Sequence, residues 1–271
     1  MAFSLRLMGK NMWVGQFSLF SSALVVHGIS TRFGGVSAPP YDSLNMALHV
    51  GDNSAAVLEN RRRFCRALGI LTERIATPKQ VHGDQIFCVT EKEAGRGWQN
   101  YGMAISQTDA LMTDVLGLPL FLCYADCVPV LLFDPVRRAV AIAHAGWKGT
   151  LRCIASKTLR AMTAAFGTDP KDCLAAIGPA IGAENYPVGD EVAAQFRAAF
   201  PAWEKEIVRL AEGAPHLDLW AANRLQLETA GLPKEHVDTA GVCTVDNRQL
   251  FFSYRADGGR TGRIGAVIAL Q

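Results

Sequence analysis

Short apolar runs of strand length alternate with helical patterns along the whole chain, and this alternation constrains the fold most strongly. Apolar runs between turn signals predict β-strands over residues 24–29, 85–90, 118–124, 128–133, 140–144, 174–177 and 264–270. Residues 17–26 are interpreted as the first strand rather than as a secretory segment, since serines interrupt this run and no small-residue cleavage site follows it.

Helical periodicity is found over residues 54–68, 150–166, 190–200 and 218–230. Ser54 is expected to cap the first of these helices, and Gly69 is its stop signal. No glycine-rich nucleotide-binding motif is present, which argues against a Rossmann or P-loop domain. Strands and helices that intermix over residues 1–271 predict a single α/β (α+β) layered domain with mixed sheets flanked by helices.

The composition is that of a soluble globular protein, with 49% hydrophobic and 19% charged residues. The net charge of +2 arises from scattered basic residues, so nucleic acid is not an expected partner. No run approaches the ~18 apolar residues of a membrane span, so no membrane partner is expected. Seven cysteines without regular spacing indicate reduced thiols and a cytoplasmic location. The oligomeric state is open.

Two histidines and a cysteine stand in short, unusual contexts: His82 in QVHGDQ, Cys127 in YADCVPV and His144 in AHAGWKGT. A thiolate with two imidazoles is a ligand set for zinc or copper, and three protein ligands leave a fourth position open. Any one of these residues alone is more often a hydrogen-bonded histidine or a small core cysteine. Because Cys127 and His144 lie at ends of neighbouring predicted strands, the pattern favours an open, catalytic metal site.

Several polar residues are candidates for proton transfer or substrate binding. Asp126 is a candidate proton shuttle, but strand neighbours point to opposite faces, so Asp126 and Cys127 can share a site only where the backbone is irregular. Arg61 falls on the apolar face of the predicted helix, where an arginine is costly unless it is paired or holds an anion such as phosphate. Loop residues that are further candidates for binding substrate or phosphate are Arg32, Asn45 and Arg255.

The chain resembles the laccase-domain family, once described as multicopper polyphenol oxidases and now largely as purine nucleoside phosphorylases. The resemblance rests on TRFGGVS, SLNMALHVGD, QVHGDQI, TDALMT, ADCVPVLL, HAGWKGT, IGPAIG and FFSYR, in this order over residues 23–270. It implies a fold related to cysteine hydrolases and a zinc or copper site at His82, Cys127 and His144. It also implies phosphorolysis of adenosine, inosine, guanosine and methylthioadenosine, and deamination of adenosine, with purine nucleosides and phosphate as substrates.

Other activities remain as alternatives. A multicopper mechanism needs a second, histidine-rich copper cluster, and six histidines without a His-x-His pair argue against it. A single copper ion at the same site could still support polyphenol oxidation. Without metal, Cys127 and His144 could act as a cysteine hydrolase with Asp126 nearby, for instance in editing peptidoglycan precursors. A closed structural metal site would need a fourth ligand that no similar motif supplies.

Overall fold

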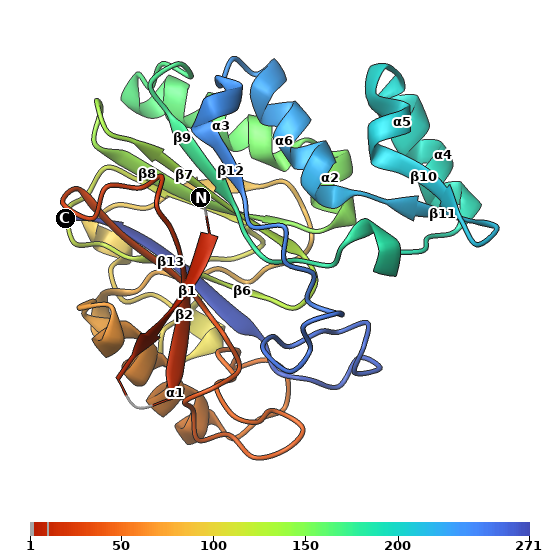
Figure 1. The fold of residues 1–271 in the computed structure, drawn as a ribbon. Helices are drawn as coiled ribbons and strands as arrows, with labels where there is room; N and C mark the ends of the chain where they lie inside the picture. The colour runs from red at the N-terminus through yellow and green to blue at the C-terminus, as the bar shows by residue number, and fades with distance from the viewer. Residues whose placement is uncertain (1–2, 10) are drawn as a thin grey trace.

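A computed structural model of the chain describes residues 3–9 and 11–271, which form two large β-sheets with helices on their outer faces (Figure 1). The five-stranded sheet is antiparallel and has the order β1-β2-β3-β13-β6. Its strands are β1 (Phe3–Met8), β2 (Met12–Phe17), β3 (Val25–Ser30), β13 (Ile264–Leu270) and β6 (Leu120–Tyr124).

The six-stranded sheet is mixed, with the order β12-β9-β7-β8-β5-β4. Its central neighbours are antiparallel, and the pair at each edge is parallel. Its strands are β12 (Val237–Thr239), β9 (Leu174–Ile177), β7 (Val128–Asp134), β8 (Ala139–Ala145), β5 (Ala110–Thr113) and β4 (Ile86–Cys88). A separate hairpin pairs β10 (Val208–Ala211) with β11 (Ala214–Leu217).

Helices cover the outer face of each sheet, so the layers follow the order helix, sheet, sheet, helix (Figure 1). The α-helices are α1 (Ser54–Ala67), α2 (Trp147–Leu151), α3 (Ile154–Phe166), α4 (Asp190–Ala199), α5 (Glu204–Ile207) and α6 (Leu219–Thr229). Phe64 of α1 packs on the five-stranded sheet, whereas Leu159 of α3 packs on the six-stranded one. None of the described helices is long and apolar enough to cross a membrane.

Strand β7 shows why the strands of the central layers have continuously apolar sequences. Its side chains alternate between two cores, because Val130 and Leu132 face the helices while Leu131 and Phe133 face the other sheet. All its residues are buried and all except Asp134 are apolar, so each face of the strand packs in a hydrophobic core. The predicted layered α/β architecture is confirmed, but only the six-stranded sheet is mixed and the five-stranded one is antiparallel. The relation to cysteine hydrolases stays a prediction.

Three local predictions were wrong. Residues 17–26 are not the first strand, because β1 and β2 precede them and the serine-containing segment 18–24 forms turns before β3. Asn53, not Ser54, caps α1, since its side chain accepts a hydrogen bond from the N–H of Ala56. The helix expected over 150–166 begins earlier and divides into α2 and α3, because Cys153 adopts a left-handed conformation with φ 62°.

Candidate metal centre and active site

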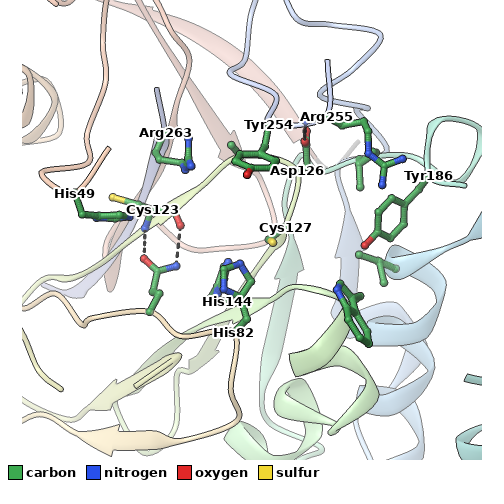
Figure 2. A pocket seen from close by; sticks show the side chains of 15 residues that line it. His49, His82, Cys123, Asp126, Cys127, His144, Tyr186, Tyr254, Arg255 and Arg263 are labelled. Carbon is green, nitrogen blue, oxygen red and sulfur yellow. Dashed lines mark hydrogen bonds between the residues drawn. The ribbon is translucent and has the colours of Figure 1, made fainter. Parts of the chain in front are cut away.

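A cavity of about 560 Å³ opens beside the segment that crosses from one sheet to the other (Figure 2). β6 ends at Tyr124 and β7 begins at Val128, so the crossing segment comprises residues 125–127. Asp126 has a left-handed φ of 78°, which breaks the strand and brings both Asp126 and Cys127 to the cavity wall. The irregular backbone that these neighbours need in order to share a site is therefore present.

The structure brings the three predicted ligands together in this cavity. Ligand atoms of His82, Cys127 and His144 all lie within 4.8 Å of one another. Figure 2 shows the three side chains grouped in the cavity. The antiparallel register of β7 and β8 pairs Val128 with Ala145, which sets Cys127 beside the end of β8, where His144 lies. His82 arrives from a turn before β4, where its φ is 58°. Within residues 3–9 and 11–271 no second group of this kind is found.

A buried carboxylate that the sequence did not single out connects the two histidine segments. Asp109 precedes β5 and is fully buried. Its Oδ1 lies 2.9 Å from Nδ1 of His144. Its two oxygens also accept the backbone N–H groups of Val81, His82 and Gly83 at 3.1, 3.0 and 2.7 Å. One side chain thus contacts both histidine-bearing segments of the candidate metal centre.

The residues present fit a metal ion. An ionised carboxylate only accepts hydrogen bonds, so Nδ1 of His144 carries the proton and Nε2 is available as a ligand. A Cβ built on Gly146 would lie 2.9 Å from Sγ of Cys127 and 3.2 Å from Cδ2 of His82. Glycine at this position therefore leaves the ligand atoms room that any larger residue would fill.

The same cluster holds a charged pair when no metal is bound. Burial raises the pKa of Cys127, but the charge and hydrogen bonds of His144 and His82 outweigh it and lower the pKa to about 6. Burial lowers the pKa of His144, whereas the thiolate of Cys127 and the carboxylate of Asp109 raise it to about 9. Cys127 is therefore a thiolate at neutral pH, which is the form that binds metals and attacks electrophiles.

Asp126 lines the cavity, but both of its carboxylate oxygens are engaged. Oδ1 accepts the hydroxyl of Thr244 at 2.6 Å, and Oδ2 accepts the backbone N–H of Arg255 at 2.7 Å. These contacts anchor the loop that carries Arg255 against the ligand segment. The observed geometry thus gives Asp126 an anchoring role, and its function as a proton shuttle stays a prediction.

Two guanidinium groups line the cavity on opposite sides of the ligand cluster (Figure 2). Arg255, a predicted binding residue, lies with its Cζ 5.1 Å from the ring centroid of Tyr186. Arg263 lies on the side of His49, with its Cζ 5.4 Å from the ring centroid of Tyr254. His49 and Tyr254 belong to motifs that marked the family resemblance, yet only three-dimensional contacts place their side chains in the cavity.

Arg61 is not part of the cavity lining. Its side chain is buried at 2% exposure, and its guanidinium donates to the backbone carbonyls of Met46, Gly97 and Trp98 at 2.9, 3.1 and 2.6 Å. An arginine on the apolar face of α1 is therefore stabilised by main-chain oxygens rather than by an anionic ligand. The expectation that it faces phosphate has no support in this arrangement.

Asn45 and Arg32 also lie outside the cavity lining. Asn45 is fully buried; its Oδ1 accepts the backbone N–H of Arg263 at 2.9 Å, and its Nδ2 donates to Asp52 at 2.9 Å. Arg32 donates from Nε to the carbonyl of Asp42 at 2.9 Å. Asn45 therefore holds the backbone of the cavity residue Arg263, and Arg32 stabilises the loop that contains Asp42. Neither side chain is placed to contact a ligand in the cavity.

The family model described as "Multi-copper polyphenol oxidoreductase laccase" matches residues 26–271, and the chain belongs to this family. Its relatives include proteins named purine nucleoside phosphorylase. YlmD of Bacillus subtilis is 36% identical over 247 residues, which cover 91% of this chain and 89% of the relative. The Deinococcus radiodurans protein is 43% identical, also with 91% and 89% coverage. The resemblance stated from the sequence motifs is confirmed.

Solved structures agree with this assignment. The hypothetical protein YfiH of Bacillus licheniformis superimposes with a TM-score of 0.93 at 38% identity, covering 98% of this chain and 99% of that chain. YlmD of Geobacillus stearothermophilus superimposes with a TM-score of 0.92 at 39% identity, covering 98% of each chain. Since nearly the whole of each chain is covered, the layered fold is shared from end to end.

Proposed function

We propose that the chain is, as one catalytic domain, a metal-dependent purine nucleoside phosphorylase. Its proposed substrates are adenosine, inosine, guanosine and methylthioadenosine, and we propose that it also deaminates adenosine. The observation that carries the proposal is the convergence of His82, Cys127 and His144 in a cavity that also holds two guanidinium groups. Relatives at 36–43% identity named purine nucleoside phosphorylase support purine nucleosides and phosphate as the substrate class.

The cavity walls suggest where each part of the substrate binds. Tyr186 and Trp147 line the cavity and pack against the apolar cluster that contains Leu219, so we assign the purine to this side. Arg255, beside Tyr186, is suited to stabilise the negative charge that develops on the departing base. We assign phosphate to the opposite side, beside Arg263, where a guanidinium can hold it for attack on the anomeric carbon.

We further propose that His82, Cys127 and His144 hold zinc in the cell and can take copper in vitro. Zinc supplies Lewis-acid chemistry, which suits the exchange of the adenine amino group for oxygen. The role of the chain's own residues is to present the thiolate of Cys127 and one nitrogen of each histidine toward one point. All seven cysteines are free, which accords with the proposed cytoplasmic location.

A second candidate uses the same residues without metal. Cys127 and His144 form a thiolate–imidazolium pair, and Asp109 contacts the far nitrogen of His144. This order of nucleophile, base and orienting carboxylate is that of a cysteine hydrolase, for which a peptidoglycan precursor would be the substrate. Oxidation of polyphenols at a single copper ion, with dioxygen as the electron acceptor, would use the same three ligands.

Metal analysis coupled to a nucleoside assay separates these candidates. Wild type and Cys127→Ala are purified, their zinc and copper content is measured, and adenosine is supplied with and without phosphate. We expect one metal per wild-type chain, phosphate-dependent release of adenine, phosphate-independent formation of inosine, and loss of metal and both products in Cys127→Ala. Nucleoside turnover that persists in Cys127→Ala would refute the proposal, and metal-free protein without turnover would favour the hydrolase.

A further inference from the structure

We propose that Asp109 is the positioning residue of the metal centre: its carboxylate fixes both the nitrogen that His144 presents and the backbone turn that carries His82. The inference rests on the metal site proposed above, and it does not depend on which nucleoside, if any, is the substrate. Its basis is geometric, since one buried side chain reaches both segments.

The contact with His144 is determined by strand register. β5 pairs antiparallel with β8, Ala110 opposite Ala143, and this register brings Asp109 next to His144. The backbone N–H of His144 donates to the carbonyl of Asp109 at 2.8 Å, and the two side chains meet at 2.9 Å. Because the Nδ1 proton points to the carboxylate, Nε2 is the nitrogen that faces the metal position.

The contact with His82 acts through the main chain. The His82 residue is exposed, so packing alone does not fix it. Its left-handed φ of 58° costs a non-glycine residue about 1 kcal/mol or more. Three successive amides, from Val81 to Gly83, converge on the carboxylate of Asp109 and hold this conformation. The exposed side chain of His82 is thus positioned through its backbone.

Four donors therefore converge on the two oxygens of Asp109. This number explains why a carboxylate, and not an amide, is needed at the position. An asparagine has only one accepting oxygen, and its NH₂ group would face either the backbone N–H groups or Nδ1 of His144. In the second case the amide favours the tautomer with the proton on Nε2, which blocks that nitrogen as a ligand.

Asp134 provides a matched control. It is also fully buried, and its Oδ1 accepts the two backbone N–H groups of Val136 and Arg137 at 2.9 Å, at the opposite end of β7 from Cys127. Asp109→Asn and Asp134→Asn both replace a buried, amide-binding carboxylate by its isostere. Only the first replacement touches the segments that carry the proposed ligands.

The test measures zinc affinity by competition with a chromophoric chelator, together with the absorption spectrum of the cobalt-loaded proteins. We expect the Kd for zinc to rise about 10–100-fold in Asp109→Asn, with a changed cobalt spectrum, while Asp134→Asn resembles wild type in both. An Asp109→Asn protein with wild-type affinity and spectrum would overturn the inference. Equal losses in both variants would also overturn it, because they would reflect the loss of any buried carboxylate.

A second measurement uses the wild type alone, so that it holds even if Asp109→Asn fails to fold. In zinc-loaded, ¹⁵N-labelled protein, we expect NMR to show the metal on Nε2 of His144 and the proton on Nδ1. The opposite assignment would overturn the inference. Failure of nucleoside turnover with these results intact would refute only the proposed activity, whereas wild-type protein that binds no zinc would refute the metal centre and this inference together.

Discussion

Replacing Gly146 by alanine is expected to crowd the proposed metal centre directly. Gly146 is the N-cap of α2 with φ −70° and ψ 175°, values that alanine adopts without strain. The added methyl carbon would nevertheless lie 2.9 Å from Sγ of Cys127 and 3.2 Å from Cδ2 of His82. Two of the three proposed ligands must move to admit it.

The size of the effect follows from these distances. Non-bonded heavy atoms are attracted most at about 3.5–4.0 Å, so the sulfur and the methyl group must separate by roughly 0.6 Å or more. Metal–ligand distances tolerate only about 0.2 Å. We therefore expect zinc affinity to fall about 10–100-fold, which corresponds to about 1.4–2.8 kcal/mol. Overpacking of other tightly packed sites costs about 1–3 kcal/mol, which agrees with this range.

Gly189→Ala is the control for this substitution. Gly189 is also an N-cap glycine, at α4 with φ −69° and ψ 154°, and a Cβ there meets nothing within 4 Å. Both variants carry the same change of capping residue, so their difference isolates the crowding. The assay is chelator competition for zinc, followed by phosphorolysis of adenosine. Zinc affinity in Gly146→Ala within twofold of that in Gly189→Ala would refute the reasoning.

Burial, assisted by the charge of Arg6, lowers the pKa of His27 from 6.5 to about 4. As pH falls from 6.5 to about 4, His27 binds a proton in the unfolded chain but not in the folded chain. Urea unfolding should therefore show that the free energy of unfolding falls by about 3 kcal/mol over this interval, and His27→Gln should abolish this fall. Arg61→Met should lower the free energy of unfolding by about 3 kcal/mol without a selective rise in the KM for phosphate, since three main-chain carbonyls lose their donor. Arg263→Gln should raise the KM for phosphate about tenfold, whereas Arg255→Gln should lower kcat. The reverse pattern would place phosphate beside Arg255 and the purine beside Arg263.

Sequence patterns predicted the central strands well because those strands are buried on both faces. The runs 174–177 and 264–270 coincide with β9 and β13, and 128–133 falls within β7. Strand β1 was missed because its burial is partial: its positions are half-buried or exposed, and it lies at the edge of its sheet. Burial alone does not decide the outcome, since β5 is buried throughout and was not predicted, whereas the partly buried edge strand β4 was.

The candidate site was predictable to the extent that residue type alone carries its chemistry. His82, Cys127 and His144 could be proposed as ligands because a thiolate and two imidazoles together form a ligand set for zinc or copper, although each residue alone is more often structural. Arg61 was assigned to phosphate because a charge on an apolar helix face requires a partner, but the partners proved to be backbone carbonyls, which no sequence pattern reveals. Asp109 was missed for the same reason, since its role depends on the pairing of β5 with β8.

The backbone conformation of the candidate metal centre shows why local sequence preferences did not predict the geometry of this site. His82 and Asp126 have φ values of 58° and 78°, a region that glycine adopts most readily, yet neither position is a glycine. Each needs its side chain: His82 supplies a proposed ligand, and Asp126 holds the loop that carries Arg255. The cost is offset by contacts distant in sequence, those of Asp109 for His82 and those of Thr244 and Arg255 for Asp126. The conformations that assemble the cavity therefore depend on contacts between residues distant in sequence, which is why they leave no local signal in the sequence.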